Sequence, residues 1–87
     1  MSDNQSSVTT AIITLGTDET CVIHYKLVRG TDVQKGTLEC SESGDLLFDE
    51  YIGPDTGVTF SLNAGVLEYA TTSTGNTAAL TYVIFKQ

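Results

Sequence analysis

Residues 66–85 read VLEYATTSTGNTAALTYVIF, and no other part of the chain indicates its secondary structure so clearly. Two alternating runs, residues 66–72 and 77–85, are rich in threonine, tyrosine, valine and isoleucine, which favour a pleated surface. Between the runs, Gly75 and Asn76 tolerate the positive φ that a tight turn demands. The pattern predicts a β-hairpin.

The two faces of this predicted hairpin lead to different expectations. One face is apolar and predicts a core seed formed by Leu67, Tyr69, Leu80, Tyr82 and Ile84. On the second run, the opposite face carries Thr81, Val83 and Phe85, and either a second sheet layer or a neighbouring chain must cover it. We favour a neighbouring chain, because the domain is small and has few charged residues. The predicted interface residues are Val83 and Phe85, with Ile12 and the N-terminal arm behind them.

A second hairpin is predicted further towards the N-terminus. Residues 21–28 alternate and place Cys21, Ile23, Tyr25 and Leu27 on one face. A Gly-X pair is the preferred centre of a two-residue type II′ loop, and Gly30-Thr31 supplies one. This loop predicts a register whose facing pairs are Arg29–Asp32, Lys26–Lys35, Ile23–Leu38 and Cys21–Cys40. The two lysines count against the register, because like charges directly opposite each other are destabilising.

The rest of the chain adds shorter elements. Residues 8–15 and 58–62 predict strands, and residues 45–52 predict a strand in preference to one short helical turn. On the last of these, Leu46, Phe48 and Ile52 share one face. Turns recur at the spacing of roughly 8 to 12 residues that marks a sandwich or a barrel. We therefore predict a flexible N-terminal arm, residues 1–7, and a single all-β domain, residues 8–87, folded as an antiparallel β-sandwich or partly open β-barrel of six to seven strands.

Composition and charge argue against several classes of partner. Four basic and eleven acidic residues give a net charge of −7, which repels phosphate backbones and anionic lipids, so we expect no nucleic acid and no membrane partner. No apolar run approaches the ~20 residues of a membrane span, and no basic segment followed by an apolar one opens the chain. The expected product is made and kept in the cytosol.

Residue types that carry catalysis or bind metals do not cluster in the sequence. His24 is the only histidine, and no serine lies in a Gly-x-Ser-x-Gly elbow, so we expect no enzyme, no zinc site and no cofactor. Calcium or glycosidic chemistry is an alternative use of Asp45, Asp49 and Glu50, but these residues lack EF-hand spacing. We interpret them as charges that guard a strand edge. The segment from Arg29 to Asp32 is interpreted as a turn closed by an ion pair.

The two cysteines leave two alternatives. In the predicted register Cys21 and Cys40 lie opposite each other, within reach of a disulfide bond. The alternative is a pair of small buried thiols, which we favour because the N-terminal sequence lacks a signal-peptide pattern and disulfides are uncommon in reducing compartments.

Three segments point to a known class of protein: residues 23–34 (IHYKLVRGTDVQ), 55–60 (DTGVTF) and 67–82 (LEYATTSTGNTAALTY). In this order they resemble β-rich modules of tailed-bacteriophage virion proteins, notably tail-fibre, head-fibre and capsid-decoration components. The resemblance implies a role on the virion surface. Taken as complete at 87 residues, the chain lacks the long shaft of a fibre, which favours a small separate subunit on a larger lattice.

The resemblance leads to a functional expectation with named alternatives. We expect a non-enzymatic virion protein, made in the host cytoplasm, that acts as a capsid decoration (cement) subunit. It would bind the major capsid protein or another virion protein and self-associate, with a trimer favoured. Alternatives are a tail-fibre or head-fibre module and a carbohydrate-binding β-sandwich in which Tyr51 or Tyr69 stacks on a sugar held by acidic loops. A small hydrolase would need His24 clustered with a serine and an aspartate.

Overall fold

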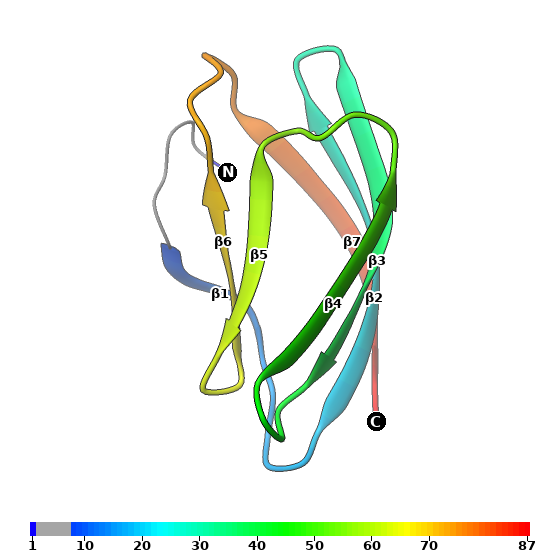
Figure 1. The fold of residues 1–87 in the computed structure, drawn as a ribbon, viewed down its shortest axis with the longest axis vertical. Coiled ribbons are helices and arrows are strands. Elements are labelled where there is room, and N and C mark those ends of the chain that lie inside the picture. The colour runs from blue at the N-terminus through cyan, green and yellow to red at the C-terminus, as the bar shows by residue number, and fades with distance from the viewer. Residues whose placement is uncertain (2–7) are drawn as a thin grey trace.

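The structure is a computed structural model that describes Met1 and residues 8–87. Its strands are β1 (Val8–Thr14), β2 (Thr20–Arg29), β3 (Asp32–Ser41), β4 (Leu46–Ile52), β5 (Val58–Asn63), β6 (Val66–Thr71) and β7 (Ala78–Lys86). They form two antiparallel sheets, with strand orders β1-β6-β5 and β4-β3-β2-β7 (Figure 1). The predicted all-β sandwich is therefore confirmed. Of the predicted N-terminal arm, residues 2–7 lie outside the described residues.

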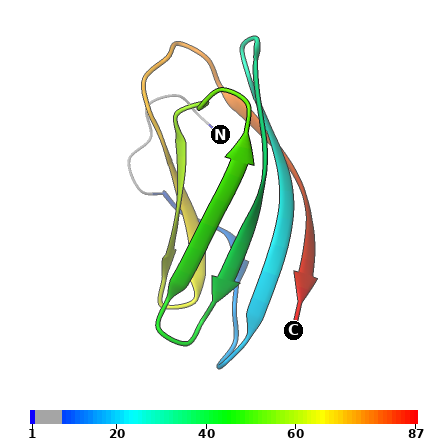
Figure 2. The same ribbon diagram turned by 45° about the vertical axis from the view of Figure 1, so that its right-hand side comes forward.

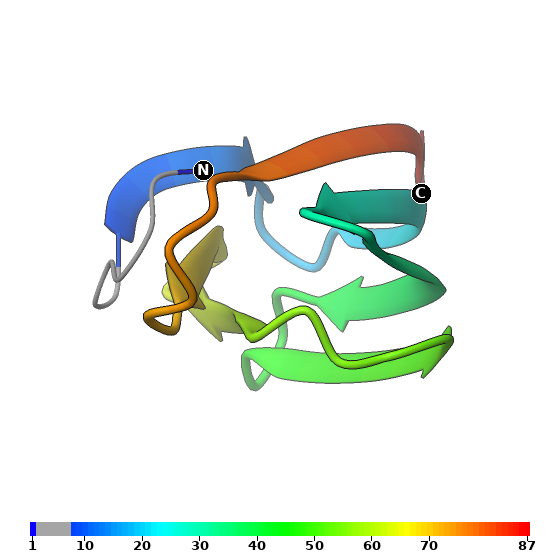
Figure 3. The same ribbon diagram turned by 90° about the horizontal axis from the view of Figure 1, so that it is seen from above.

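The core lies between the two sheets. Figure 2 shows β4, β3, β2 and β7 side by side, and Figure 3 shows the strands of both sheets from above. Both sheets contribute buried hydrophobic side chains, which are Leu15, Cys21, Ile23, Tyr25, Leu27, Leu38, Cys40, Val58, Phe60, Leu67 and Ala78. The chain passes from one sheet to the other after β1, after β4 and after β6. These crossings decide which strands become neighbours.

The β2–β3 hairpin has the predicted register. Its pairs include Arg29–Asp32, Lys26–Lys35, Ile23–Leu38 and Cys21–Cys40. Gly30 has a φ of 62°, which a type II′ loop requires at its first central position. A two-residue loop leaves no freedom in register, so the unfavourable lysine pair is retained.

The predicted hairpin over residues 66–85 is wrong, although both of its strands exist. Strand β6 pairs with β1 and β5, whereas β7 pairs with β2 in the other sheet. The tight turn lies one connection earlier, where Ala64 and Gly65 have φ values of 50° and 78°. Positive φ at both central residues is the mark of a type I′ hairpin loop, and it joins β5 to β6. With both edges of β6 occupied, residues 72–77 carry the chain across to the free edge of β2.

The apolar face of the predicted hairpin still reaches the core. Leu67 is fully buried, and Tyr69, Leu80 and Ile84 pack against the core cluster from the two sheets. Tyr82 remains 42% exposed, because β7 lies at the end of its sheet. These side chains therefore meet across the sandwich, whereas the hairpin prediction had placed them side by side.

Carboxylates hold the loops at the end of the sandwich where β3 turns into β4. Asp45 accepts hydrogen bonds from the backbone N–H groups of Ala64 (3.2 Å) and Gly65 (3.0 Å). Glu42 accepts one from the N–H of Asp18 at 2.8 Å. The predicted edge-guarding role of Asp45 is thus replaced by a specific one, because its side chain fixes the β5–β6 turn.

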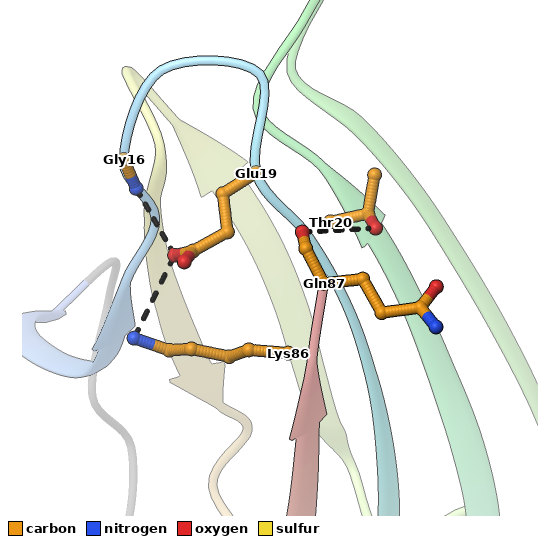
Figure 4. A network of polar contacts seen from close by, with 5 residues as sticks. All are labelled: Gly16, Glu19, Thr20, Lys86 and Gln87. Carbon is orange, nitrogen blue, oxygen red and sulfur yellow. Dashed lines mark hydrogen bonds and ion pairs between the residues drawn. The ribbon is translucent and has the colours of Figure 1, made fainter.

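The chain's last residues are attached to the same end. Glu19 accepts a hydrogen bond from the N–H of Gly16 at 3.1 Å and lies 3.6 Å from the Nζ of Lys86 (Figure 4). Thr20 and Gln87 exchange two backbone hydrogen bonds of 2.8 Å each. The β2–β7 pairing is therefore continued to the last residue.

Candidate functional site

The outward-facing side of the four-stranded sheet is the candidate site. Directly paired residues of an antiparallel sheet point to the same side, so the pairings sort these side chains into rows. The rows are Phe85–Val22–Glu39–Phe48, Val83–His24–Thr37–Glu50 and Thr81–Lys26–Lys35–Ile52. We call these side chains, together with Val28, Val33 and Leu46 beside them, the outer face.

The outer face exposes large apolar side chains. Their exposed fractions are 46% for Val33, 54% for Phe48, 56% for Val83 and Phe85, 64% for Leu46 and 73% for Ile52. The other sheet differs, because the outward pairs between β5 and β6 are Thr59–Ala70 and Ser61–Glu68. Except for Val33, these side chains lie on the two edge strands, β4 and β7, and most of the side chains between them are polar or charged. Exposed apolar side chains in such numbers are typical of sites of interaction. The contrast makes the outer face the candidate docking surface.

The charges on the outer face are balanced, although the chain as a whole is acidic. The face carries Lys26 and Lys35, two of the four basic residues, but only Glu39 and Glu50 of the eleven acidic ones. The lysines lie in one row and Glu39 lies two rows away. The repulsion expected from a net charge of −7 is therefore weakest on this face.

His24 lies near the middle of the outer face. Its Nδ1 is 3.3 Å from the Thr37 hydroxyl, and its ring meets that of Phe85 edge-on with a centroid separation of 5.9 Å. These contacts hold the histidine ring within the outer face.

The structure separates the predicted interface residues. Val83 and Phe85 both lie on the outer face and are exposed in the single chain. Ile12 lies on β1 in the other sheet, half-buried against the core. Leu46, Phe48 and Ile52 share one side of β4, as predicted, and they extend the outer face to its far edge. Alternation along each strand does not join them with Val83, because β3 and β2 lie between the two strands.

A buried arginine is the functional group that sequence analysis missed. Arg29 is 4% exposed, and its guanidinium donates to the backbone carbonyls of Thr56 (2.8 Å), Thr72 and Asn76 (3.0 Å). Those carbonyls belong to two of the three connections that cross between the sheets, residues 53–57 and 72–77. Arg29 therefore fastens both crossings to the end of β2. Its position after a strand and before a glycine suggested only a turn residue.

A second set of buried polar groups extends from this site. Gln34 accepts hydrogen bonds from the N–H and the hydroxyl of Thr56, at 2.9 and 2.8 Å. Its amide nitrogen donates to the Tyr25 hydroxyl at 3.1 Å, and that hydroxyl donates to Asp49 at 2.7 Å. Burial raises the pKa values of Tyr25 and Asp49, and the hydrogen bond between them raises that of Tyr25 further. The tyrosine is therefore a hydrogen-bond donor at neutral pH.

The surface above Arg29 forms a depression of about 350 Å³. Its lining is polar and consists of Arg29, Asp32, Asp55, Thr56, Gly57, Thr72, Thr74 and Asn76. Asp55 already accepts a hydrogen bond from the N–H of Gly57 at 2.7 Å. The tyrosines proposed for sugar stacking lie elsewhere, since Tyr69 packs against the core and Tyr51 lies on β4. The lining thus lacks the aromatic platform that the sugar-stacking alternative required.

Cys21 and Cys40 are free thiols that face each other across β2 and β3. They are 3% and 4% exposed. Burial first, and the neighbouring Cys21 second, raise the pKa of Cys40 to about 12. Because the thiolate is the reactive form, Cys40 is protected both by lack of access and by lack of charge.

We expect alkylating reagents to distinguish the folded chain from the unfolded one. At pH 8 a thiol with a pKa of about 12 is ionised in roughly one molecule in ten thousand, so folded Cys40 should react about a thousandfold more slowly than an ordinary cysteine. Mass spectrometry after iodoacetamide treatment without reductant measures this. Two labels per chain should appear only after denaturation. A denatured chain without labels would instead show a Cys21–Cys40 bond.

Within the described part of the chain, no group of three or more histidine, cysteine, aspartate or glutamate side chains is placed to hold a metal ion. The same residues include no helix long and apolar enough to cross a membrane. Comparison of the chain with protein-family models, with curated proteins and with solved structures found no match. What the chain does must therefore be inferred from its own surfaces.

Proposed function

We propose that the chain is a non-enzymatic structural subunit of the capsid-decoration type, which self-associates and attaches to a virion lattice. The observation that carries this proposal is the outer face, where Val83, Phe85 and Phe48 are each more than half exposed on a regular sheet. Covering such side chains with a partner protein is favourable by about 25 cal/mol per Å² of apolar surface buried. The resemblance to virion modules suggests the kind of assembly that would supply the partner.

The size of the domain supports the same proposal. A chain of 87 residues buries only somewhat more than ~60% of its unfolded surface, so its core provides a small margin of stability. A subunit that binds neighbours only when folded gains stability by mass action. Docking through the outer face would therefore raise the free energy of unfolding of the domain and would also position it on a lattice.

The two contacts of a decoration subunit would use different parts of the chain. The outer face serves the neighbouring subunits. Within the N-terminal arm, residues 1–7, we propose that residues 2–7 contact the major capsid protein, because their sequence is polar and can become ordered on a partner. Met1 itself exchanges two hydrogen bonds of 2.9 Å with Ala78 and packs against the core. Such a subunit would be made in the host cytoplasm and reside in the virion.

Light scattering coupled to size exclusion, at several concentrations, tests the self-association. We expect the unchanged chain to form an oligomer and Phe85→Asp to weaken its association about 30-fold, since a charge then replaces an anchoring aromatic side chain worth roughly 2 kcal/mol. Thr59→Asp is the matched control, because it adds the same charge to the other sheet. Association that survives Phe85→Asp would contradict the use of the outer face.

Attachment to a lattice is tested separately by co-sedimentation with assembled capsids. Binding should saturate at a fixed ratio of chains to capsid subunits. A chain that stays monomeric at every concentration and also fails to bind capsids would overturn the proposed function.

A further inference from the structure

We propose that the outer face binds the outer face of a second copy of this chain through a two-fold axis. The axis lies between the four-stranded sheets of the two copies, parallel to the sheets and perpendicular to their strands. The inference rests on the self-association in the proposed function and specifies its geometry. Each sheet would then lie face to face with its copy, and every contact would occur twice.

Two of the four charged side chains of the outer face, Lys35 and Glu39, exchange positions under this rotation. The His24–Thr37 row lies between the row of Glu39 and the row of Lys35, which are neighbours on the same strand. A 180° rotation about an axis along the His24–Thr37 row places each strand over the same strand of the second copy. It also places the Lys35 row of one copy over the Glu39 row of the other. Lys35 then lies over Glu39 of the second copy, and Glu39 lies over the second Lys35. Two complementary charge pairs result from one surface.

The apolar side chains of β4 follow the same exchange. Ile52 shares a row with Lys35, and Phe48 shares a row with Glu39. The rotation therefore sets Ile52 over Phe48 of the second copy, and these two are 73% and 54% exposed in the single chain. Burying an isoleucine against a phenylalanine twice provides the hydrophobic part of the contact.

Charge also decides between this axis and its main rival. A two-fold axis parallel to the strands, between β2 and β3, would exchange those strands and keep each row. Lys26 would then lie over Lys35 of the second copy, and like charges across an interface are unfavourable. The rival axis makes this contact twice, whereas the perpendicular axis makes one like-charge contact, between Glu50 in the row on the axis and Glu50 of the second copy.

The single chain leaves its lysine pair without a compensating neighbour in the row. Lys26 and Lys35 are direct partners, and their other partners are Thr81 and Ile52. A like-charge pair directly opposite is destabilising in a sheet. Glu39 of the second copy would place a carboxylate directly over Lys35, in addition to Glu50, which is the diagonal neighbour of Lys35 on β4.

The available area suits a dimer of moderate affinity. Four strands spaced about 4.8 Å apart, over about ten residues of 3.3 Å each, offer roughly 600 Å² per copy. The total of roughly 1,200 Å² lies at the lower end of specific interfaces. Sheets packed face to face are separated by about 10 Å, a distance that lysine and glutamate side chains can bridge together.

Charge reversal tests the geometry. Lys35→Glu and Glu39→Lys should each weaken the dimer about tenfold, because two attractive pairs become repulsive and each exposed pair contributes up to ~1 kcal/mol. The double variant K35E/E39K should restore the dimer. It keeps the net charge of −7, so the recovery would reflect the position of the charges and not their sum. Sedimentation equilibrium at low salt measures all four dissociation constants.

Glu68→Lys is the matched control for a charge change on the other sheet. It should leave the dissociation constant unchanged, and thermal unfolding should show that every variant is folded. The two-fold geometry is overturned if the double variant stays as weak as the single ones, or if the unchanged chain is a monomer at all concentrations.

The outcomes separate this inference from the proposed function. If the charge-reversal variants associate as tightly as the unchanged chain, the proposed axis is wrong but the proposed self-association stands. A trimer, which the sequence analysis favoured, would also overturn it, since a closed ring of three joins two different patches on each subunit. The capsid-binding measurement decides the virion role independently of either result.

Discussion

Replacing Arg29 with alanine should lower the free energy of unfolding by about 3–5 kcal/mol, the range found when one partner of a buried charged interaction is removed. The guanidinium is 4% exposed and donates to three backbone carbonyls, on Thr56, Thr72 and Asn76. Without it these carbonyls lose their charged donor, and each such hydrogen bond contributes about 1.5–3 kcal/mol. For a domain of this size the melting temperature should fall by at least about 12 °C.

Urea unfolding followed by circular dichroism measures the effect of Arg29→Ala. Arg29→Lys should recover little, because one ammonium group cannot span three carbonyls on two connections as a planar guanidinium does. Lys86→Ala is the control, since it removes a cation from an ion pair whose side chains are 45% and 30% exposed and should cost at most about 1 kcal/mol. A loss for Arg29→Ala no larger than that of Lys86→Ala would contradict the bridging role.

The second large effect is expected at Gly36, on β3. A Cβ added there would lie 2.5 Å from the carbonyl oxygen of Glu50 and 2.8 Å from both the Tyr25 hydroxyl and the Tyr51 Cβ. The nearest atom belongs to the backbone of β4, so it cannot rotate away. Gly36→Ala should therefore cost about 1–3 kcal/mol through overpacking and displace the Tyr25 hydroxyl from Asp49.

Gly16→Ala is the matched control for Gly36→Ala. A Cβ at Gly16 meets nothing within 4 Å. In open space the exchange of glycine for alanine stabilises a protein by about 0.4–1 kcal/mol, because the unfolded chain loses freedom. The two substitutions should thus shift the thermal midpoint in opposite directions. Equal shifts of the thermal midpoint would mean that the backbone of β4 at Glu50 leaves room for a methyl group at Gly36.

The sequence predicted local pairing far better than distant pairing. The β2–β3 register followed from Gly30-Thr31 alone, because a two-residue loop fixes every pair along the hairpin. Alternation over residues 66–85 identified two strands correctly but contained no information on their partners. That information lies in the Ala64-Gly65 turn and in the crossing after β6, whose consequence depends on the whole sheet order.

The candidate site was predictable in part for the same reason. Alternation alone separated Val83 and Phe85 from the core side of β7, and it grouped Leu46, Phe48 and Ile52 on one side of another strand. That both groups belong to one surface follows only from the pairing of β7 with β2 and of β4 with β3. Arg29 was unpredictable, since its acceptors lie 27, 43 and 47 positions away along the chain.

The pairing of the last strand with β2 also has a consequence for synthesis. Thr20 and Gln87, which bond to each other at the end of this ladder, are separated by 67 positions. On a ribosome, β2 and β3 can pair early, but the edge of β2 stays open until β7 has emerged. Pairing over such a separation is slow because a long loop must close first. Nascent chains close together on one messenger could therefore exchange their final strands, producing intertwined pairs.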